Sequence, residues 1–254
     1  MKKHTTRTLR HYKLGEKKSA LQMLTCYDFQ TAQMLNETEL DMILVGDSLG
    51  NVILGYETTV EVGLETMILF SKAVKKGAPD KFVVADLPFG SYSSVNKGLE
   101  SSVKLFQQSN VEALKLEGAY PHELKLIERL TQIGIPVMGH IGLTPQSVHE
   151  LGGYYTHGKD EASKNKLMIE AKNLEKAGCF AIVLECVEEN LATEITKNLS
   201  IPTIGIGSGT KTDGQVLVIN DLLHLGKNDP PKFCQPIANL YSEKRKLIEN
   251  YLKR

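Results

Sequence analysis

The sequence predicts an α/β fold of the (βα)8 TIM-barrel type, and three observations carry that prediction. Eight short apolar runs alternate with segments whose apolar residues recur at three- and four-residue spacing, as in strands and amphipathic helices. The runs are nearly continuously apolar, which is typical of parallel strands covered on both faces. No flexible linker or shift in composition interrupts the alternation. A closed barrel fits eight such units best, and a doubly wound open sheet is the alternative.

The predicted strands are short and apolar. They are Ala20–Thr25, Met42–Gly46, Lys81–Ala85, Glu112–Leu116, Ile135–Gly139, Phe180–Leu184, Ile201–Ile204 and Gln215–Ile219. Two of them open with Ile-Pro, at Ile135 and Ile201, where a proline at the strand start costs little pairing.

The predicted helices fill the intervals between the strands. They are Phe29–Glu39, Val60–Lys76, Asn96–Ser109, His122–Gln132, Glu161–Ala177 and Glu188–Asn198. The second ends in Lys-Lys-Gly-Ala-Pro, where cations, a glycine and a proline mark a helix terminus. The connection Gly205–Gly214 is too short for a helix, and residues 239–253 predict a last helix.

The whole chain, residues 1–254, is predicted to form one domain. Residues 1–18 predict an N-terminal helix or arm with Leu9 and Tyr12 on one side. This segment lacks the apolar core of a secretory signal, and its shortage of acids leaves a transit peptide as the alternative.

Composition excludes several classes of partner. Thirty basic residues balance thirty acidic ones, which argues against nucleic acid or an anionic membrane. No apolar run approaches the roughly 18 residues that a membrane span needs. The four cysteines show no metal-binding spacing and fit reduced thiols in a cytosolic protein.

Ionisable side chains stand at the ends of five successive predicted strands, the second to the sixth. These ends read Gly46-Asp47-Ser48, Ala85-Asp86-Leu87-Pro88, Lys115-Leu116-Glu117-Gly118, Gly139-His140-Ile141-Gly142 and Leu184-Glu185-Cys186. In a parallel barrel this rim holds the active site. A single acid there is usually a helix cap or turn former. Several acids at one rim must be neutralised by a cation or by proton uptake.

Side-chain alternation predicts which residues share an inner face with these groups. If Asp47 points into the barrel, Val45 and Ile43 do so too. The same rule places only apolar residues beneath Asp86 and Glu185, as barrel filling requires.

The fourth strand is the exception, because Lys115 shares its face with Glu117. A buried lysine needs an anionic partner. One alternative is an internal ion pair between Lys115 and Glu117. The other is that Lys115 meets a carboxylate or oxyanion of a substrate.

The donor types at this rim indicate a metal. Asp47, Asp86 and Glu117 are hard oxygen donors with no cysteine nearby, which favours Mg²⁺ over zinc. Such an ion keeps positions for water or a chelating 2-oxo acid, whose carbonyl it would polarise to stabilise an enolate. Glu185 or His140 could accept the proton from the neighbouring carbon, although His140 could equally be a hydrogen-bonded core histidine.

Two loops carry weaker signals. Gly205–Gly209 lacks the remainder of a dinucleotide or P-loop motif and is predicted to be a tight turn at the barrel mouth. Gly142–Lys159 is a long connection of the kind that often forms a lid.

The motifs at the strand ends resemble those of the ketopantoate hydroxymethyltransferase family. They are Val45–Gly50, Ala85–Phe89, Lys115–Gly118, Gly139–Ser147, Leu184–Cys186 and Ile204–Gly207. The resemblance runs from about Thr25 to Phe233 in consistent order. It implies transfer of a one-carbon unit from 5,10-methylenetetrahydrofolate to 3-methyl-2-oxobutanoate, in pantothenate synthesis.

The resemblance also implies roles for individual residues. Asp47 and Asp86 would bind Mg²⁺ and the oxo acid, and Glu117 would complete the metal site, either directly or through water. Ser48 and Lys115 would bind the substrate. Glu185 would be the proton acceptor. His140 would lie close to the reacting centre and the substrate.

The family further implies a (βα)8 barrel with an N-terminal helix, assembled as a homodecamer in the cytoplasm. The chain departs from the family pattern at Ser208, where alanine is usual, and in the short segment after Phe233. Two rival hypotheses remain: a metal-dependent lyase or mutase that uses the same rim without folate, and a barrel kept as a binding module.

Overall fold

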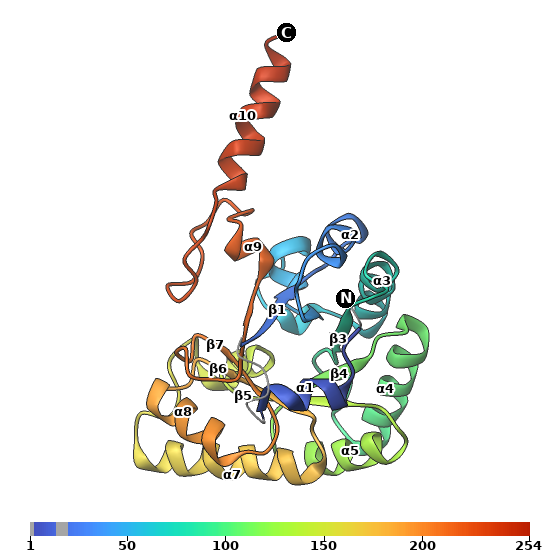
Figure 1. The fold of residues 1–254 in the computed structure, drawn as a ribbon, viewed down its shortest axis with the longest axis vertical. Coiled ribbons are helices and arrows are strands. Elements are labelled where there is room, and N and C mark those ends of the chain that lie inside the picture. The colour runs from blue at the N-terminus through green and yellow to red at the C-terminus, as the bar shows by residue number, and fades with distance from the viewer. Residues whose placement is uncertain (1–2, 14–19) are drawn as a thin grey trace.

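Eight parallel strands close into a barrel in chain order, with β8 paired back to β1 (Figure 1). This computed structural model describes residues 3–13 and 20–254. The strands are β1 (Leu21–Thr25), β2 (Met42–Val45), β3 (Phe82–Asp86), β4 (Ala113–Glu117), β5 (Val137–Gly142), β6 (Ala181–Glu185), β7 (Thr203–Ile206) and β8 (Gly214–Leu217). Each lies where a strand was expected, and the closed ring decides for the barrel over the open sheet.

Helices follow most strands and form the outer layer. They are α1 (Thr6–Lys13), α2 (Phe29–Asn36), α3 (Leu64–Gly77), α4 (Val95–Ser109), α5 (Pro121–Gln132), α6 (Val148–Leu151), α7 (Glu161–Ala177), α8 (Glu189–Asn198), α9 (Ile219–Leu222) and α10 (Leu240–Leu252). Gly50–Leu54 forms a π-helical turn, and Thr59–Glu61 and Pro145–Ser147 form 3-10 turns. None of the helices in the described ranges is long and apolar enough to cross a membrane.

Local sequence explains where several helices begin. The side chains of Asp28, Ser94 and Asp160 accept hydrogen bonds from the third backbone N–H beyond them, which satisfies an otherwise free donor of α2, α4 and α7. The α3 helix begins later than its predicted start at Val60, because a 3-10 turn and the extended Gly63 precede it.

Two apolar layers are packed on the two faces of the strands. Alternate strand residues, such as Met42 and Leu44 of β2, form one cluster that also contains Leu9 of α1. The intervening residues, such as Ile43 and Val45, pack with the surrounding helices. Burial on both faces is the reason that the strands read as continuous apolar runs.

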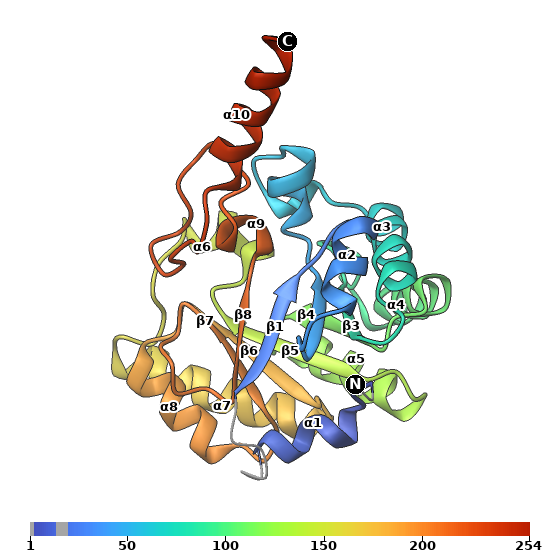
Figure 2. The same cartoon turned by 45° about the horizontal axis from the view of Figure 1, so that its top comes forward.

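The α1 helix lies across one end of the barrel, and α6 and α9 lie at the opposite end (Figure 2). Leu9 is 1% exposed and packs into the barrel cluster. Tyr12 donates a hydrogen bond of 2.6 Å to Asp41, and Lys13 lies 3.1 Å from Asp213. The N-terminal helix is therefore confirmed, although the rest of the predicted arm, residues 1–2 and 14–18, lies outside the described ranges.

Removing the Leu9 side chain tests this contact. We expect Leu9→Ala to lower the free energy of unfolding by about 2–5 kcal/mol, because it leaves a cavity at the end of a close-packed core. Urea unfolding measures the change. Arg10→Ala, at the exposed next position, should shift it by no more than about 0.5 kcal/mol. Equal effects of the two substitutions would contradict a packing role for Leu9.

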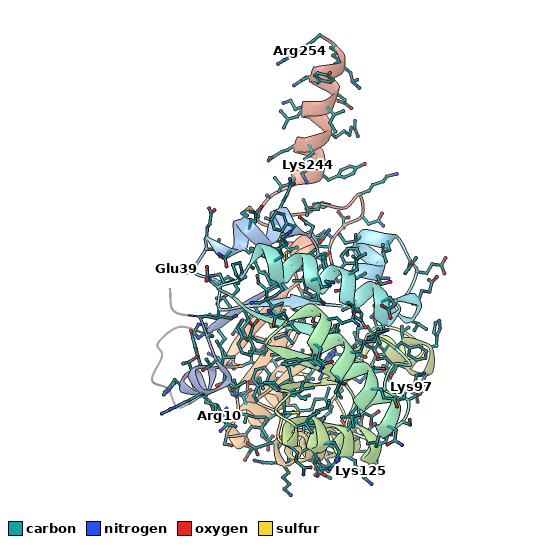
Figure 3. All side chains as sticks on the ribbon, turned by 90° about the vertical axis from the view of Figure 1, so that its right-hand side faces the viewer. Arg10, Glu39, Lys97, Lys125, Lys244 and Arg254 are labelled. Carbon is teal, nitrogen blue, oxygen red and sulfur yellow. The ribbon has the colours of Figure 1, made fainter. Side chains whose placement is uncertain are left out.

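The α10 helix projects away from the barrel (Figure 1), and Figure 3 shows its side chains between Lys244 and Arg254 surrounded by open space. No residue of α10 is buried. Leu247, Ile248, Tyr251 and Leu252 are all more than half exposed. An apolar set of this kind on a projecting helix is typical of an interaction surface.

Candidate active site

Every residue predicted for the site lines one small cavity at the carboxyl end of the barrel. Its volume is about 90 Å³, and its lining includes Asp47, Ser48, Asp86, Lys115, Glu117, His140 and Glu185. Cavities that hold drug-sized ligands measure roughly 300–1,000 Å³, so this one suits a compact substrate. The structure thus brings together side chains that come from five successive strand ends.

Strand register determines which of these side chains meet. Asp86 of β3 is the direct partner of Lys115 of β4, and their Oδ1 and Nζ atoms lie 2.8 Å apart. Glu117 is the direct partner of His140, whose Nδ1 lies 3.5 Å from Glu117 Oε1. Lys115 therefore has an internal ion-pair partner, but it is Asp86 of the neighbouring strand, and the alternative of a pair with Glu117 is wrong.

Asp47 reaches the cavity by a different route from the one predicted. Met42 and Leu44 face the barrel interior, so the expectation that Val45 shares the inner face of Asp47 is wrong. The strand ends at Val45, and the turn at Gly46 breaks the alternation before Asp47. A Cβ at Gly46 would lie 2.8 Å from Ser48 Oγ, so any other residue at this turn would push the Ser48 hydroxyl group aside.

Asp47 is then held from two sides. Its backbone N–H donates to Asp86 Oδ2 at 3.1 Å, and its Oδ2 accepts a hydrogen bond of 2.7 Å from Gln146 Nε2. Burial, with the nearby carboxylates of Asp86 and Glu117, raises the pKa of Asp47 well above its usual range. Asp47 therefore needs a proton or a cation to be stable where it stands.

His140 lies at the centre of the charged cluster. Its Nε2 is 3.2 Å from Glu185 Oε2 but makes no well-aligned hydrogen bond, and its Nδ1 is 3.4 Å from Lys115 Nζ. Burial and the Lys115 ammonium group lower the pKa of His140. The carboxylates of Glu117 and Glu185 outweigh both effects and raise the pKa to about 9. His140 is therefore an imidazolium at neutral pH.

The raised pKa predicts a pH dependence of stability. Protonated His140 stabilises the folded chain below its usual pKa of 6.5, and this contribution is lost as the pH rises toward about 9. In the presence of a chelator, we expect the free energy of unfolding to fall across that interval. The fall is on the order of 1.4 kcal/mol per unit of pKa shift. His140→Asn should flatten the profile, whereas His149→Asn, at an exposed position, should leave it unchanged. Identical slopes for wild type and His140→Asn would contradict the assignment.

Gln146 is the functional residue that sequence reasoning missed most clearly. It is 5% exposed, and its backbone N–H donates to Glu117 Oε2 at 3.1 Å while its side chain holds Asp47. Tyr92 Oη donates to Gln146 Oε1 at 2.6 Å and fixes the orientation of the amide. Gln146 lies within the Gly139–Ser147 motif, but no spacing rule connects a glutamine after β5 with an aspartate after β2.

Tyr27 is a second residue at the cavity that sequence reasoning did not identify. Its phenol group shares a hydrogen bond of 2.8 Å with Ser48 Oγ, and burial raises its pKa above the usual value. Tyr27 is therefore neutral and orients the hydroxyl group of Ser48 at the cavity.

Tight backbone packing holds Glu185 in place. Gly142 has a φ of +95°, and a Cβ there would lie 2.3 Å from the carbonyl oxygen of Glu185. Leu143 N–H donates to that same carbonyl at 2.8 Å. Ser208 accepts a hydrogen bond of 2.9 Å from Val187 N–H and donates one of 2.8 Å to Leu184 O. Ser208, where alanine is usual in the family, therefore adds hydrogen bonds to backbone groups before and after Glu185.

The charges in this cluster fit a divalent cation. The carboxylates are Asp47, Asp86, Glu117 and Glu185, and the cations are Lys115 and His140. With all of them ionised, two negative charges are unbalanced. In the described ranges, no three His, Cys, Asp or Glu side chains are arranged to hold a metal directly. Asp47 and Asp86 are hard oxygen donors, the ligand type that suits Mg²⁺ when water or substrate completes its coordination.

Known proteins resemble this chain in sequence and in fold. The model of the ketopantoate hydroxymethyltransferase family matches residues 3–254. The 3-methyl-2-oxobutanoate hydroxymethyltransferase of Leptospira interrogans is 49% identical over 93% of this chain and 89% of its own length. That of Geobacillus sp. (strain WCH70) is 47% identical over 95% of this chain and 86% of its own length.

Solved structures show the same barrel at low sequence identity. A 2,3-dimethylmalate lyase matches with a TM-score of 0.64 and 15% identity, over 98% of this chain and 86% of its own. A phosphonopyruvate hydrolase in complex with oxalate and Mg++ matches with a TM-score of 0.63 and 10% identity, over 85% of this chain and 81% of its own. These likenesses confirm the barrel fold, while the sequence matches decide between the transferase and the lyase hypotheses. The chain belongs to the ketopantoate hydroxymethyltransferase family.

Proposed function

We propose that the cavity at the carboxyl end of the barrel is where this chain, a 3-methyl-2-oxobutanoate hydroxymethyltransferase by family, makes 2-dehydropantoate (ketopantoate) for pantothenate biosynthesis. 5,10-Methylenetetrahydrofolate donates the one-carbon unit. The observation that carries the assignment is the convergence of the predicted rim residues on one cavity that suits a compact acid.

The charged residues suit binding of the oxo acid. Lys115 is buried, and burial lowers its pKa, but the carboxylates of Asp86, Glu117 and Asp47 outweigh burial and keep the pKa above its usual value. Lys115 is therefore a permanent cation that attracts the substrate carboxylate. Ser48 Oγ adds a hydrogen bond to the substrate.

Asp47 and Asp86 would hold Mg²⁺, with Glu117 contributing directly or through water. When bound, the ion supplies Lewis-acid polarisation of the keto group. Gln146 holds both Asp47 and Glu117 and so keeps the two carboxylates oriented toward the same space.

Glu185 is the proton acceptor in this proposal. The reaction replaces the C3–H bond of the oxo acid by a bond to the methylene carbon of the folate, and a water molecule supplies the hydroxyl oxygen of the CH2OH group. A base must therefore take the C3 proton. The carboxylates of Glu117 and Glu185 raise the pKa of His140, which favours its protonated form and makes it the poorer acceptor. Glu185 Oε2 lies 3.2 Å from His140 Nε2, so the imidazolium orients the carboxylate and balances its charge before it accepts the proton.

The homodecamer and the cytoplasmic location implied by the family are also proposals. The exposed apolar residues of α10, Leu247, Ile248, Tyr251 and Leu252, support self-association. Sedimentation equilibrium of the intact chain measures the assembly state directly.

Deuterium exchange at C3 of 3-methyl-2-oxobutanoate, followed by NMR, tests the proposed site chemistry. We expect exchange with Mg²⁺ and little with a chelator, and 2-dehydropantoate once 5,10-methylenetetrahydrofolate is added. C3 exchange at the same rate with Mg²⁺ and with a chelator would contradict the proposed role of the metal. Exchange without any product on adding the folate would contradict the transferase chemistry.

A further inference from the structure

A second, larger cavity adjoins the oxo-acid pocket. Its volume is about 710 Å³, within the range that holds ligands of cofactor size. Glu117 lines both cavities, so molecules bound in the two would meet beside that residue. The loops after β3, β4 and β5 and the start of α7 form the remaining walls.

Glu123 is an unusual group in this wall. It stands in the first turn of α5, its side chain is 8% exposed, and its Oε1 lies 2.8 Å from His122 Nε2. Its Oε2 is buried with no hydrogen-bond partner in the described residues. Leaving a buried carboxylate oxygen unpaired costs at least about 1–3 kcal/mol, so a water molecule or a ligand group must pair with Glu123 Oε2. Its place in the wall of a cavity makes it accessible to a ligand.

A second unpaired polar atom lines the same cavity. His157 Nε2 is buried without a partner in the described part of the chain. The backbone N–H of His157 donates to Cys186 O at 2.7 Å, directly after Glu185, so its position is tied to the catalytic strand end. Burial, and then the Lys166 ammonium group, lower the pKa of His157, which leaves a neutral ring able to donate or accept a hydrogen bond.

Flat apolar surfaces complete the cavity. Phe89, Tyr120 and Tyr155 line it, and they are 51%, 58% and 49% exposed. The Tyr155 ring stacks on His157 at a centroid distance of 4.4 Å. Exposed aromatic faces around a cavity are available to stack on a planar ligand.

We propose that this cavity holds the reduced folate, with the donor edge of its pteridine ring paired with the Glu123 carboxylate. The inference deepens the proposed function and rests on it. A pteridine carries a ring N–H beside an exocyclic amino group, and two adjacent donors match the two oxygens of one carboxylate. The methylene group then points toward Glu117, where the two cavities meet.

The charges of the wall favour one orientation of the folate. Glu117 and Glu123 repel an anionic group from the inner end. The exposed Lys159 and Lys166 also line the cavity and attract one, beside the acidic Glu150, Asp160 and Glu170, of which Glu170 lies 3.7 Å from Lys166 Nζ. The glutamate end of the folate therefore points outward, and the uncharged pteridine ring points inward.

Binding of two probes to Glu123→Gln tests the proposal. The probes are 5-formyltetrahydrofolate and 6-methyltetrahydropterin, which lacks the glutamate end, and calorimetry measures their affinities. Glutamine presents one donor to the donor edge, so we expect both probes to bind about 10- to 100-fold more weakly. Glu128→Gln, on the exposed face of the same helix, should bind both as wild type does.

The two lysines provide a second, surface test. Replacing Lys159 and Lys166 together by alanine should weaken binding of 5-formyltetrahydrofolate about 10-fold or less and leave the affinity for 6-methyltetrahydropterin unchanged.

Kinetics provide a further test of Glu123→Gln. The KM for the folate should rise in this variant, while C3 exchange of the oxo acid stays at the wild-type rate.

The outcomes separate this proposal from the function on which it rests. Normal affinity of Glu123→Gln for both probes would overturn the cavity assignment, even if wild-type turnover is intact. A double lysine variant that weakens both probes equally would overturn the proposed orientation. A wild-type chain that neither exchanges C3 nor forms product would instead overturn the proposed function.

Discussion

Glu185→Gln is expected to lower turnover by about 10²- to 10⁴-fold, the range attributed to a positioned general base. The amide keeps the shape of the side chain but cannot accept the C3 proton. C3 deuterium exchange should fall by the same factor, because it reports the same step without the folate. Binding of the oxo acid should change little, because Lys115 and Ser48 remain in place.

The matched control is Glu128→Gln, which makes the same chemical change at an exposed position of α5. It should leave turnover and exchange at wild-type values. If Glu185→Gln exchanges deuterium normally, Glu185 is not the proton acceptor. The cationic state of His140 would then have to be measured directly, by the NMR titration of its ring.

Asp86→Asn is expected to abolish the response of C3 exchange to Mg²⁺. The substitution removes one of the two carboxylates proposed to hold the ion and replaces the partner that lies 2.8 Å from Lys115 Nζ. Breaking a buried ion pair costs about 3–5 kcal/mol when the remaining charge is left alone. Lys115 keeps Glu117 and Asp47 as neighbours, so the loss in unfolding free energy should lie at or below about 3 kcal/mol.

Calorimetric titration with Mg²⁺ in the presence of oxo acid measures the metal affinity independently of activity, and urea unfolding measures the stability. Asp229→Asn, at an exposed position, should change neither quantity. An Asp86→Asn chain that binds and responds to Mg²⁺ like wild type would remove Asp86 from the metal site.

The sequence was informative wherever the signal is local. Continuous apolar runs located all eight strands, because a parallel strand buried on both faces has little room for polar residues. The ionisable strand ends of β2 to β6 located the rim, because a closed parallel barrel places all carboxyl ends on one side. Glu185 and Asp86 also sit above the inner residues that alternation predicted.

Prediction failed where the decisive contact is between distant parts of the chain. Lys115 pairs with Asp86 because the β3–β4 register makes them direct partners, and register is not encoded in the periodicity of either strand. Asp47 reaches the cavity through the turn at Gly46, which resets the alternation. Gln146 holds Asp47 across 99 residues of sequence, and no local pattern reports such a contact.

The sequence by itself thus determined the eight strand-and-helix units, the family and the residue types at the rim, since periodicity and strand-end chemistry are local properties. Closure of the strands into a barrel was decided by the tertiary structure. Only the tertiary structure decided which charges pair, how His140 becomes cationic and where Glu123 lies unpaired beside the larger cavity. It also decided that α10 stands clear of the barrel. These features depend on strand register, burial and the packing of long connections, all of which are set by the closed fold as a whole.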